Sequence, residues 1–162
     1  MMKKFELSTE HKINWLGKTL YRIKACISFT TASGEEIKAG DLGGYVEKEE
    51  NLSHDGNAWI YGNAEVCGDA RVCGNAEVCK QNHWLLVGPI GSRFGFTTFF
   101  RDKDNEITVS CGCFLGKLAA FKDKVTDTHG NNHHATMYMN AAALAELHIE
   151  LLADEAEENS DV

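Results

Sequence analysis

The sequence predicts a mainly β protein with an α+β carboxy-terminal part, built around a short left-handed parallel β-helix of about two and a half coils. Three observations predict this class: a six-residue repeat in mid-chain, an alternating strand pattern before it, and short strands followed by helical apolar spacing after it. We expect an N-terminal hairpin cap at 1–39, the repeat β-helix at 40–82, an α+β module at 83–153 and an acidic disordered tail at 154–162.

The repeat occupies residues 58–79 with a period of six. Alanine recurs at one position, a branched apolar residue follows two positions later, and Gly-Asn or Gly-Asp then forms a corner. Alternate residues of a strand point to opposite sides, so the apolar positions share one interior. Three six-residue sides make one triangular coil. The residues expected to point inward are Ile60, Ala64, Val66, Ala70, Val72, Ala76 and Val78.

A coil of 18 residues, three hexads, can be tested against the residues before the repeat. Subtracting 18 from Ile60, Ala64 and Ala70 gives Leu42, Val46 and Leu52, which are all apolar. The same subtraction from Val66 and Val72 gives Lys48 and His54, which do not fit an interior. We therefore expect an irregular coil near 40–57 below the regular one. Trp84, 18 residues after Val66, is expected to close the far end.

The flanking segments predict further strands and two helices. Residues 20–25 alternate as a half-buried strand after a turn at 15–18, and strands are expected at 84–87, 94–100 and 107–113 with a turn at 102–105. A helix is expected over 114–127, ending at His129-Gly130, and a second over 134–153 with Leu144, Leu147 and Leu151 on one face. The expected core of this module contains Phe99, Cys111, Cys113, Leu118 and Phe121.

Charge is distributed unevenly along the chain. Residues 1–124 hold equal numbers of basic and acidic residues, whereas residues 125–162 hold eight acids and no Lys or Arg. Direct nucleic-acid binding is disfavoured there, because phosphate contacts need cations. Two interpretations stay open: a solvated helix face with a solubilising tail, or a surface for a basic protein partner bound through Glu146, Glu150, Asp154 and Glu155.

The composition also bears on the compartment. No apolar run is long enough to span a membrane, and the amino-terminal charges precede no apolar core of a secretory signal. A cytoplasmic protein with reduced cysteines is therefore expected.

The repeat resembles that of the hexapeptide-repeat proteins, in which an aliphatic residue precedes a small one by four positions, as Val66 precedes Ala70. A narrower resemblance rests on residues 20–25, on Gly40-Asp41-Leu42-Gly43-Gly44-Tyr45-Val46, and on the later stretches 88–93 and 111–118. These look like a family of small proteins encoded by bacteriophages and prophages, and the likeness covers most of residues 15–150. It implies a β-helical phage protein in the bacterial cytoplasm and carries no established activity or catalytic residues.

Candidate catalytic and metal-binding residues are few. Many hexapeptide-repeat proteins are acyltransferases that use a histidine base, and His54 and His83 are the candidates beside the repeat. Cys111 and Cys113 share one face of a strand, and His129, His133 and His134 follow the next helix, which makes a zinc site conceivable. The structural interpretation, in which these thiols pack beneath a helix and the histidines cap or face solvent, is preferred. No cofactor and no bound metal are expected.

Three function classes remain. The preferred one is a non-enzymatic phage protein that binds a host protein, such as a basic nucleic-acid-binding component of an antiviral defence. A small acyltransferase is second and a structural oligomeric element third. Self-association is expected, because the exterior of the predicted β-helix is unusually apolar. The exterior residues concerned are Trp59, Tyr61, Cys67, Cys73 and Cys79, unless another part of the same chain covers them.

Overall fold

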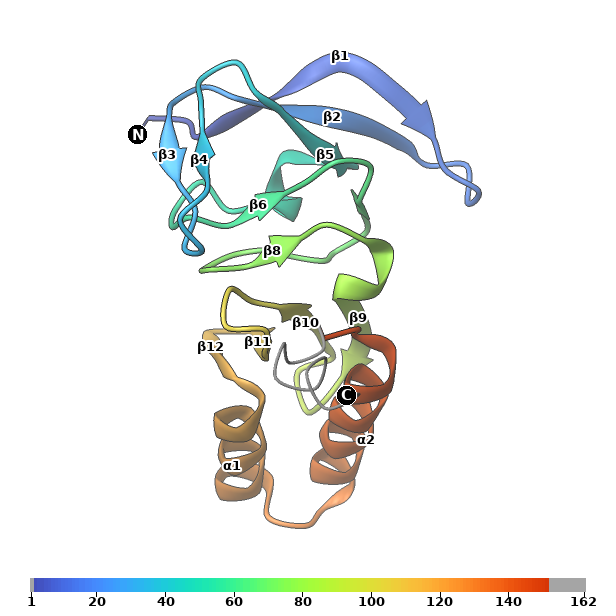
Figure 1. Ribbon diagram of the computed structural model, residues 1–162. Coiled ribbons are helices and arrows are strands. Elements are labelled where there is room, and N and C mark those ends of the chain that lie inside the picture. The colour runs from blue at the N-terminus through green and yellow to red at the C-terminus, as the bar shows by residue number, and fades with distance from the viewer. Residues whose placement is uncertain (1, 152–162) are drawn as a thin grey trace, which may run out of the picture.

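The computed structural model describes residues 2–151 and is mainly β, with open sheets and two carboxy-terminal helices. Figure 1 shows the amino-terminal hairpins at one end, a layered β region in the middle and the two helices at the other end. The prediction of a mainly β protein with an α+β carboxy-terminal part is confirmed at this level.

The amino-terminal region consists of two hairpins. Strands β1 (Phe5–Ile13) and β2 (Thr19–Ala25) pair antiparallel, and β3 (Phe29–Thr30) pairs with β4 (Glu36–Ile37). The expected strand at 20–25 and the hairpin turn before it are confirmed, and β1 is the first strand of this hairpin. Strand β2 also pairs antiparallel with β5 (Leu42–Val46), which joins the hairpin to the layered region.

Residues 42–78, here called the coil, form successive layers that pair in parallel. Strand β5 pairs with β7 (Glu65–Val66), β6 (Trp59–Ile60) pairs with β8 (Glu77–Val78), and an isolated bridge joins Leu52 to Val72. Backbone hydrogen bonds follow all three contacts, for example from Ser53 N to Val72 O at 2.9 Å. The chain therefore returns over itself on three separate segments.

The spacing between layers corrects the coil length expected from the sequence. Val46 pairs with Val66 and Leu52 with Val72, which is a separation of 20 residues, whereas Ile60 pairs with Val78 at a separation of 18. The two extra residues lie in the turn between Leu52 and Ile60. A constant subtraction of 18 was therefore wrong for the first two contacts. It placed Lys48 and His54 beneath Val66 and Val72, positions that Val46 and Leu52 occupy.

The interior of the coil is confirmed. All seven residues expected to point inward are buried, with at most 3% of their surface exposed. The corners Gly62, Gly68 and Gly74 have φ of 56°, 65° and 64°, a left-handed conformation that explains glycine at these positions. Gly44 serves another purpose, because a Cβ there would lie 2.7 Å from the carbonyl oxygen of Ala64 in the next layer.

A four-stranded antiparallel sheet covers the last layer. It consists of β9 (Trp84–Ile90), β10 (Gly95–Arg101), β11 (Ile107–Cys111) and β12 (Phe114–Lys117), in the order β12-β11-β10-β9. Phe100 is fully buried in the core of the coil, and the indole N–H of Trp84 donates to the carbonyl oxygen of Glu65 at 2.9 Å. Two 3₁₀ turns, η1 (Glu49–Asn51) and η2 (Gln81–His83), complete the β part.

Helices α1 (Leu118–His129) and α2 (His133–His148) form a second core with the sheet. The first helix begins later than expected, since Phe114 belongs to β12, and it ends before Gly130 as expected. The buried face of α2 consists of alanines, and Leu144 and Leu147 lie on its exposed side. Cys113 is exposed, which corrects its assignment to the core. Residues 152 and 153 of the expected second helix, and the tail 154–162, lie outside the described residues.

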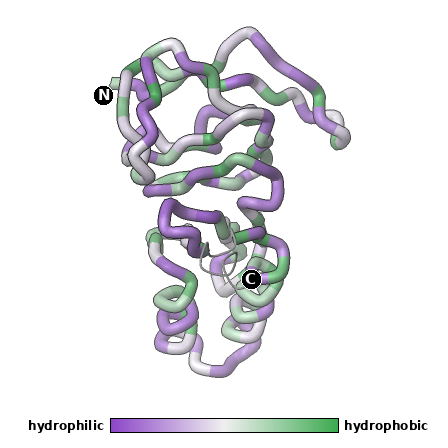
Figure 2. Tube along the Cα trace, in the orientation of Figure 1, coloured by the Kyte–Doolittle hydropathy of each residue, from purple (hydrophilic) through white to green (hydrophobic). Residues whose placement is uncertain are grey.

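Hydropathy varies over short stretches along this path. In Figure 2, hydrophobic and hydrophilic stretches alternate through the layers and along both helices. Among residues 2–151, no helix combines the length and apolar character needed to cross a bilayer.

Candidate functional site

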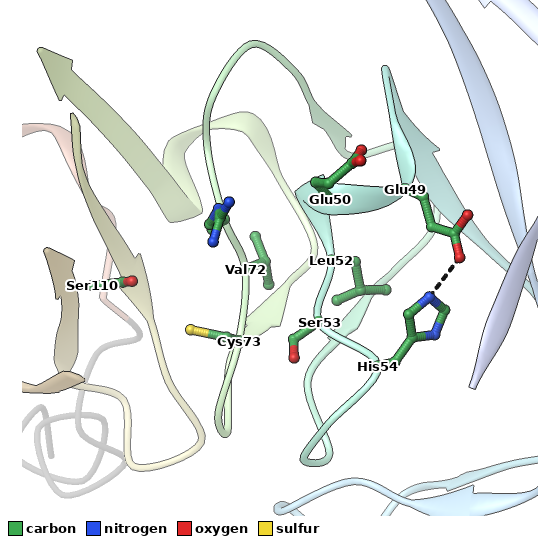
Figure 3. Close-up of a pocket in the computed structure, with 9 residues that line it drawn as sticks. Glu49, Glu50, Leu52, Ser53, His54, Val72, Cys73 and Ser110 are labelled. Atoms are coloured by element: carbon green, nitrogen blue, oxygen red, sulfur yellow. Dashed lines mark hydrogen bonds and ion pairs between the residues drawn. The ribbon is translucent and has the colours of Figure 1, made fainter. Parts of the chain in front are cut away.

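His54 lies at the turn that lengthens the first layer of the coil. Its Nδ1 accepts a hydrogen bond from the backbone N–H of Lys4 at 3.2 Å, and its Nε2 lies 2.7 Å from Oε1 of Glu49 (Figure 3). The ring also stacks on Phe5, with 4.3 Å between centroids. The acceptor role of Nδ1 places the proton on Nε2, which donates it to Glu49. Both nitrogens are therefore occupied by contacts within the chain, and His54 offers no lone pair to a substrate.

His83 lies at the opposite end of the coil and is 3% exposed. Its Nδ1 accepts a hydrogen bond from the backbone N–H of Cys79 at 3.0 Å. Burial, reinforced by the positive charges of Arg101 and Lys80, lowers the pKa of His83 to about 4. The ring is neutral near pH 7, and its Nδ1 lone pair serves the fold. Each of the two histidines considered as a candidate base thus uses its Nδ1 to hold the backbone of the chain in place.

The cysteines and histidines considered as an alternative zinc site do not form one cluster. Cys111 accepts a hydrogen bond from the Thr97 hydroxyl at 3.2 Å and packs against the core of the helices, whereas Cys113 is exposed. His133 and His129 instead each face His134, at ring-centroid distances of 3.9 and 5.6 Å. Within residues 2–151, no group of three or more His, Cys, Asp or Glu side chains is arranged to hold a metal ion.

Two of the acidic residues expected to bind a partner are engaged within the chain. Glu146 pairs with Lys122 at 2.8 Å. Glu150 accepts a hydrogen bond from the Asn82 side chain at 2.8 Å. The other two, Asp154 and Glu155, lie outside the described residues.

The apolar exterior of the coil is largely covered by the chain itself. Trp59 is 1% exposed and meets Phe29 of the second hairpin edge to face, so at this position the alternative holds that another part of the same chain covers the exterior. Tyr61 and Cys73 are partly buried against the same core. Burial raises the pKa of Cys67, Cys73 and Cys79, so these thiols stay protonated near pH 7. All six cysteines of the chain are free.

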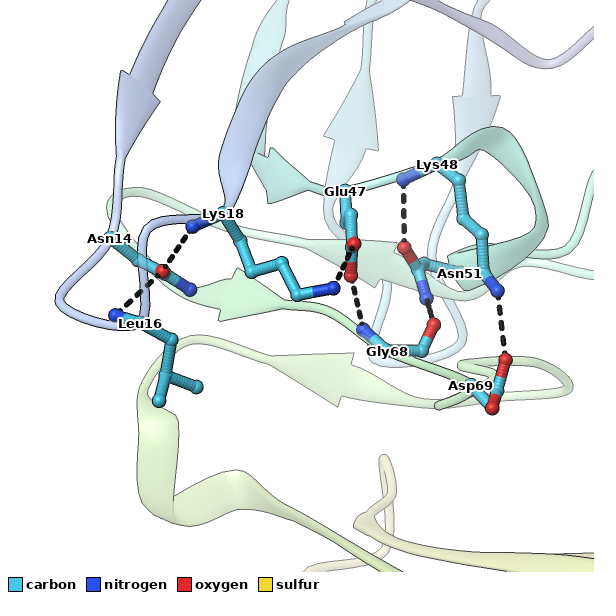
Figure 4. A network of polar contacts seen from close by, with 8 residues as sticks. All are labelled: Asn14, Leu16, Lys18, Glu47, Lys48, Asn51, Gly68 and Asp69. Atoms are coloured by element: carbon cyan, nitrogen blue, oxygen red, sulfur yellow. Dashed lines mark hydrogen bonds and ion pairs between the residues drawn. The ribbon is translucent and has the colours of Figure 1, made fainter.

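The turn between β1 and β2, expected from the sequence only as a hairpin connection, presents apolar side chains to solvent. Trp15 is 89% exposed and Leu16 is 59% exposed. The turn is nevertheless held in place, because the Asn14 side chain accepts hydrogen bonds from the backbone N–H groups of Leu16 and Lys18, both at 3.0 Å (Figure 4). The signal in the sequence for this exposed site was a tryptophan, Trp15, within a short hairpin turn.

This turn is also tied to the coil. Lys18 pairs with Glu47 at 3.0 Å, and the other oxygen of Glu47 accepts from the backbone N–H of Gly68 at 2.6 Å. These contacts lower the pKa of the Glu47 carboxyl, the backbone hydrogen bond being the larger cause. The buried Asn51 adds a second connection, donating to the carbonyl oxygens of Gly68 and Ala70 at 3.0 and 2.9 Å (Figure 4). The hairpin and two layers of the coil thus share one polar network.

Two adjoining cavities lie between the coil and the carboxy-terminal sheet. The smaller, about 460 Å³, is lined by residues that include Leu52, His54 and Cys73 (Figure 3). The larger, about 990 Å³, is here called the cleft. Glu50, Arg71 and Ser110 border both cavities. The remaining walls of the cleft come from Lys48, Asp69 and Ala70 of the coil and from residues of 92–138, among them Arg93, Phe96, Phe114, Lys124 and Tyr138.

Comparison of the whole sequence with known proteins gives no assignment: no family model matches it, and no curated protein matches it either.

Proposed function

We propose that this chain is a non-enzymatic protein that acts by binding another protein, and that the hairpin turn carrying Trp15 is its principal contact. The exposure of Trp15 on an ordered turn is the observation that carries the proposal. Tryptophan is enriched among the residues that dominate binding energy at interfaces. An ordered turn presents it at a lower entropic cost than a mobile loop would.

The hydrogen bonding of the histidines supports a non-enzymatic role. An acyltransferase of the hexapeptide-repeat kind needs a histidine with a free lone pair near the acceptor. His54 and His83 each use Nδ1 to accept a backbone hydrogen bond. We expect no acetyl-CoA turnover by the purified protein, and turnover that disappears in a His54→Ala variant would revive the acyltransferase alternative.

The experiment that tests the proposal places a photoreactive phenylalanine at position 15 in bacterial cells. Irradiation is expected to yield a covalent adduct with one host protein. Position 103, where Lys103 is exposed in another turn, serves as the matched control. An adduct of equal yield at both positions, or none at position 15, contradicts the proposal. An adduct with a second copy of this chain instead supports the structural oligomeric alternative.

We further propose that the coil is a short left-handed parallel β-helix. The six-residue period, the parallel contacts on three segments and the left-handed corner glycines support this interpretation. A phage origin, action in the cytoplasm of a bacterial host and inhibition of an antiviral defence are proposals supported by the sequence resemblance alone. In this setting the acidic segment after residue 150 would steer a basic partner, an effect that salt weakens.

Self-association is a second candidate role, favoured by the outer face of α2. Met137, Leu144 and Leu147, with Leu151 just after the helix, are 40–86% exposed. Their spacing of seven, three and four residues is that of a coiled-coil seam, which favours a second helix as the partner. We propose a second copy of the chain as that partner. Sedimentation is expected to show a dimer that a Leu144→Gln, Leu147→Gln variant loses and a Thr136→Gln control retains.

A further inference from the structure

We propose that the cleft binds a small organic anion with an aromatic ring, of the nucleotide class. This site is separate from the hairpin turn and from the outer face of α2, so its failure would leave the proposed protein-binding function intact. The argument rests on the charges that line the cleft, on the rings between them and on its size.

The cleft carries an excess of unpaired positive charge. Arg71, Arg93 and Lys124 all line it, and within the described part of the chain none of their side chains makes an ion pair or hydrogen bond. The fourth cation, Lys48, pairs with Asp69 at 2.9 Å, and the positive charge of Arg71 also helps to lower the pKa of the Asp69 carboxyl. Among the described residues, the lining therefore holds four Lys or Arg side chains and two carboxylates, and this excess of positive charge favours an anionic occupant.

The cations come from three separate elements and surround the cavity. Arg71 belongs to the coil, Arg93 to the turn between β9 and β10, and Lys124 to α1. The backbone N–H of Arg71 donates to the Thr98 hydroxyl at 3.2 Å, which fixes this part of the coil against β10. Arginine guanidinium groups bind phosphate oxygens in pairs, so Arg71 and Arg93 are suited to a phosphate group.

Aromatic surface lies between these cations. Phe96 is 41% exposed in the cleft, and Phe114 and Tyr138 line it as well. Bases of nucleotides stack on such rings, a contact worth about 1–3 kcal/mol per base. The cavity of about 990 Å³ is at the upper end of the range for small-ligand sites, so it has room for a nucleotide. A simple inorganic anion would leave the exposed ring of Phe96 without a stacking partner.

Calorimetric titration of the full chain tests the proposal. The probes are the four common ribonucleoside diphosphates, each compared with its nucleoside and with inorganic phosphate. At least one diphosphate is expected to bind with 1:1 stoichiometry, at least about tenfold more tightly than either fragment. Saturable binding of none of the four overturns the proposal. Equal affinity for the diphosphate and for inorganic phosphate also overturns it, because the rings would then contribute nothing.

Two variants locate the site. Arg71→Gln and Arg93→Gln are each expected to weaken binding about tenfold, because each removes a charged hydrogen bond to phosphate. Lys38→Gln removes an exposed cation far from the cleft lining and is expected to leave affinity unchanged. Thermal melting of all three variants checks that they fold. Binding that survives both arginine substitutions places the ligand elsewhere and contradicts the proposal.

An independent readout uses the cysteines. Cys113 lines the cleft and is exposed, and Cys26 is exposed outside it. A bound nucleotide is expected to slow alkylation of Cys113 by N-ethylmaleimide severalfold while leaving Cys26 unaffected. Equal rates at Cys113 with and without nucleotide contradict binding in the cleft.

Discussion

The coil and the helical layer bury apolar surface in different ways. In the coil, valine and alanine alternate in an interior whose layers are joined by backbone hydrogen bonds, and these side chains are buried throughout. Within the described residues, helix α2 has no backbone pairing with the sheet. Its most buried residues are alanines, such as Ala142 and Ala145, whereas Leu144 and Leu147 face outward. Backbone pairing therefore fixes the direction of side chains in the coil. In α2, the buried face is instead the one with side chains small enough to pack closely against the neighbouring elements.

The largest expected effect tests the interior of the coil. Val72→Asp places an unpaired carboxylate in a fully buried position above Leu52, and it should destabilise the protein by at least about 4 kcal/mol. Urea unfolding followed by circular dichroism measures the loss. Asn75→Asp, at an exposed corner, is the control and should change stability by less than about 0.5 kcal/mol. An unchanged urea midpoint for Val72→Asp would contradict the burial of this residue in the interior of the coil.

The matching test in the helical layer is Phe121→Ala. Phe121 is 3% exposed and its ring lies within 6 Å of those of Phe99, Phe114 and Tyr138. Removing it should cost about 3–5 kcal/mol, as truncation of a buried phenylalanine usually does. Leu115→Ala, at a site 52% exposed, is the control. If both variants melt at the same temperature, the assignment of Phe121 to the core is wrong.

The polar link between layers should have a smaller effect. Asn51 donates two hydrogen bonds to backbone carbonyls of the next layer and accepts one from the backbone N–H of Lys48 at 2.9 Å. Asn51→Ala should cost about 3 kcal/mol, at about 1 kcal/mol for each lost hydrogen bond. Asn57→Ala, at an exposed position of the coil, provides the reference. Equal stability of the two variants would show that the link between layers contributes nothing.

A matched pair of substitutions examines the inner face of α2. Ala142→Leu inserts volume into a site with no exposed surface and should cost about 1–3 kcal/mol. Ala143→Leu makes the same chemical change at an exposed neighbour and should stay within about 0.5 kcal/mol. Thermal unfolding at low protein concentration compares them. The reverse order would mean that the leucine face packs inward after all.

The remaining test is a pH dependence at the junction of the two regions. The pKa of His83 is about 4 when folded and about 6.5 when unfolded. Between these values the unfolded chain binds a proton that the folded chain does not, so stability falls as the pH drops from about 6.5 to 4. His83→Asn keeps an acceptor for the Cys79 N–H and removes the titration. The stability of this variant should fall less between pH 6.5 and 4 than that of the unchanged protein, measured by urea unfolding. An equal fall in both proteins would contradict the lowered pKa of His83.

The sequence predicted the coil better than the helical layer for a physical reason. Each hexad repeats the same backbone geometry, so the period alone predicts that the side chains of Ala64 and Val66 point inward. The length of the first layer could not be predicted in this way, because the extra residues in the turn after Leu52 leave no trace in the period. In α2, the leucines were expected to share one face, but nothing in the period showed that alanines and not leucines would be buried against the sheet.

The candidate sites were harder to predict. Charged and aromatic residues of the cleft come from distant segments, such as Arg71, Arg93 and Tyr138, and only the packing of the sheet on the coil brings them together. Trp15 was visible in the sequence, yet its exposure depends on a hairpin that extends beyond the body of the molecule (Figure 1). His54 and His83 were weak candidates for a catalytic base, and their neighbours explain them as hydrogen-bonding supports of the fold.

The longer turn between Leu52 and Ile60 has a consequence for how such proteins evolve. The parallel contacts before and after this turn remain in register although it adds two residues, because each contact is fixed by its own backbone hydrogen bonds. Insertions and deletions at corners are therefore nearly neutral, whereas a single residue gained or lost within a side reverses which side chains face inward. Lineages of this protein should diverge in length at corners such as Asp55-Gly56, and a foreign epitope spliced there should leave the layers intact.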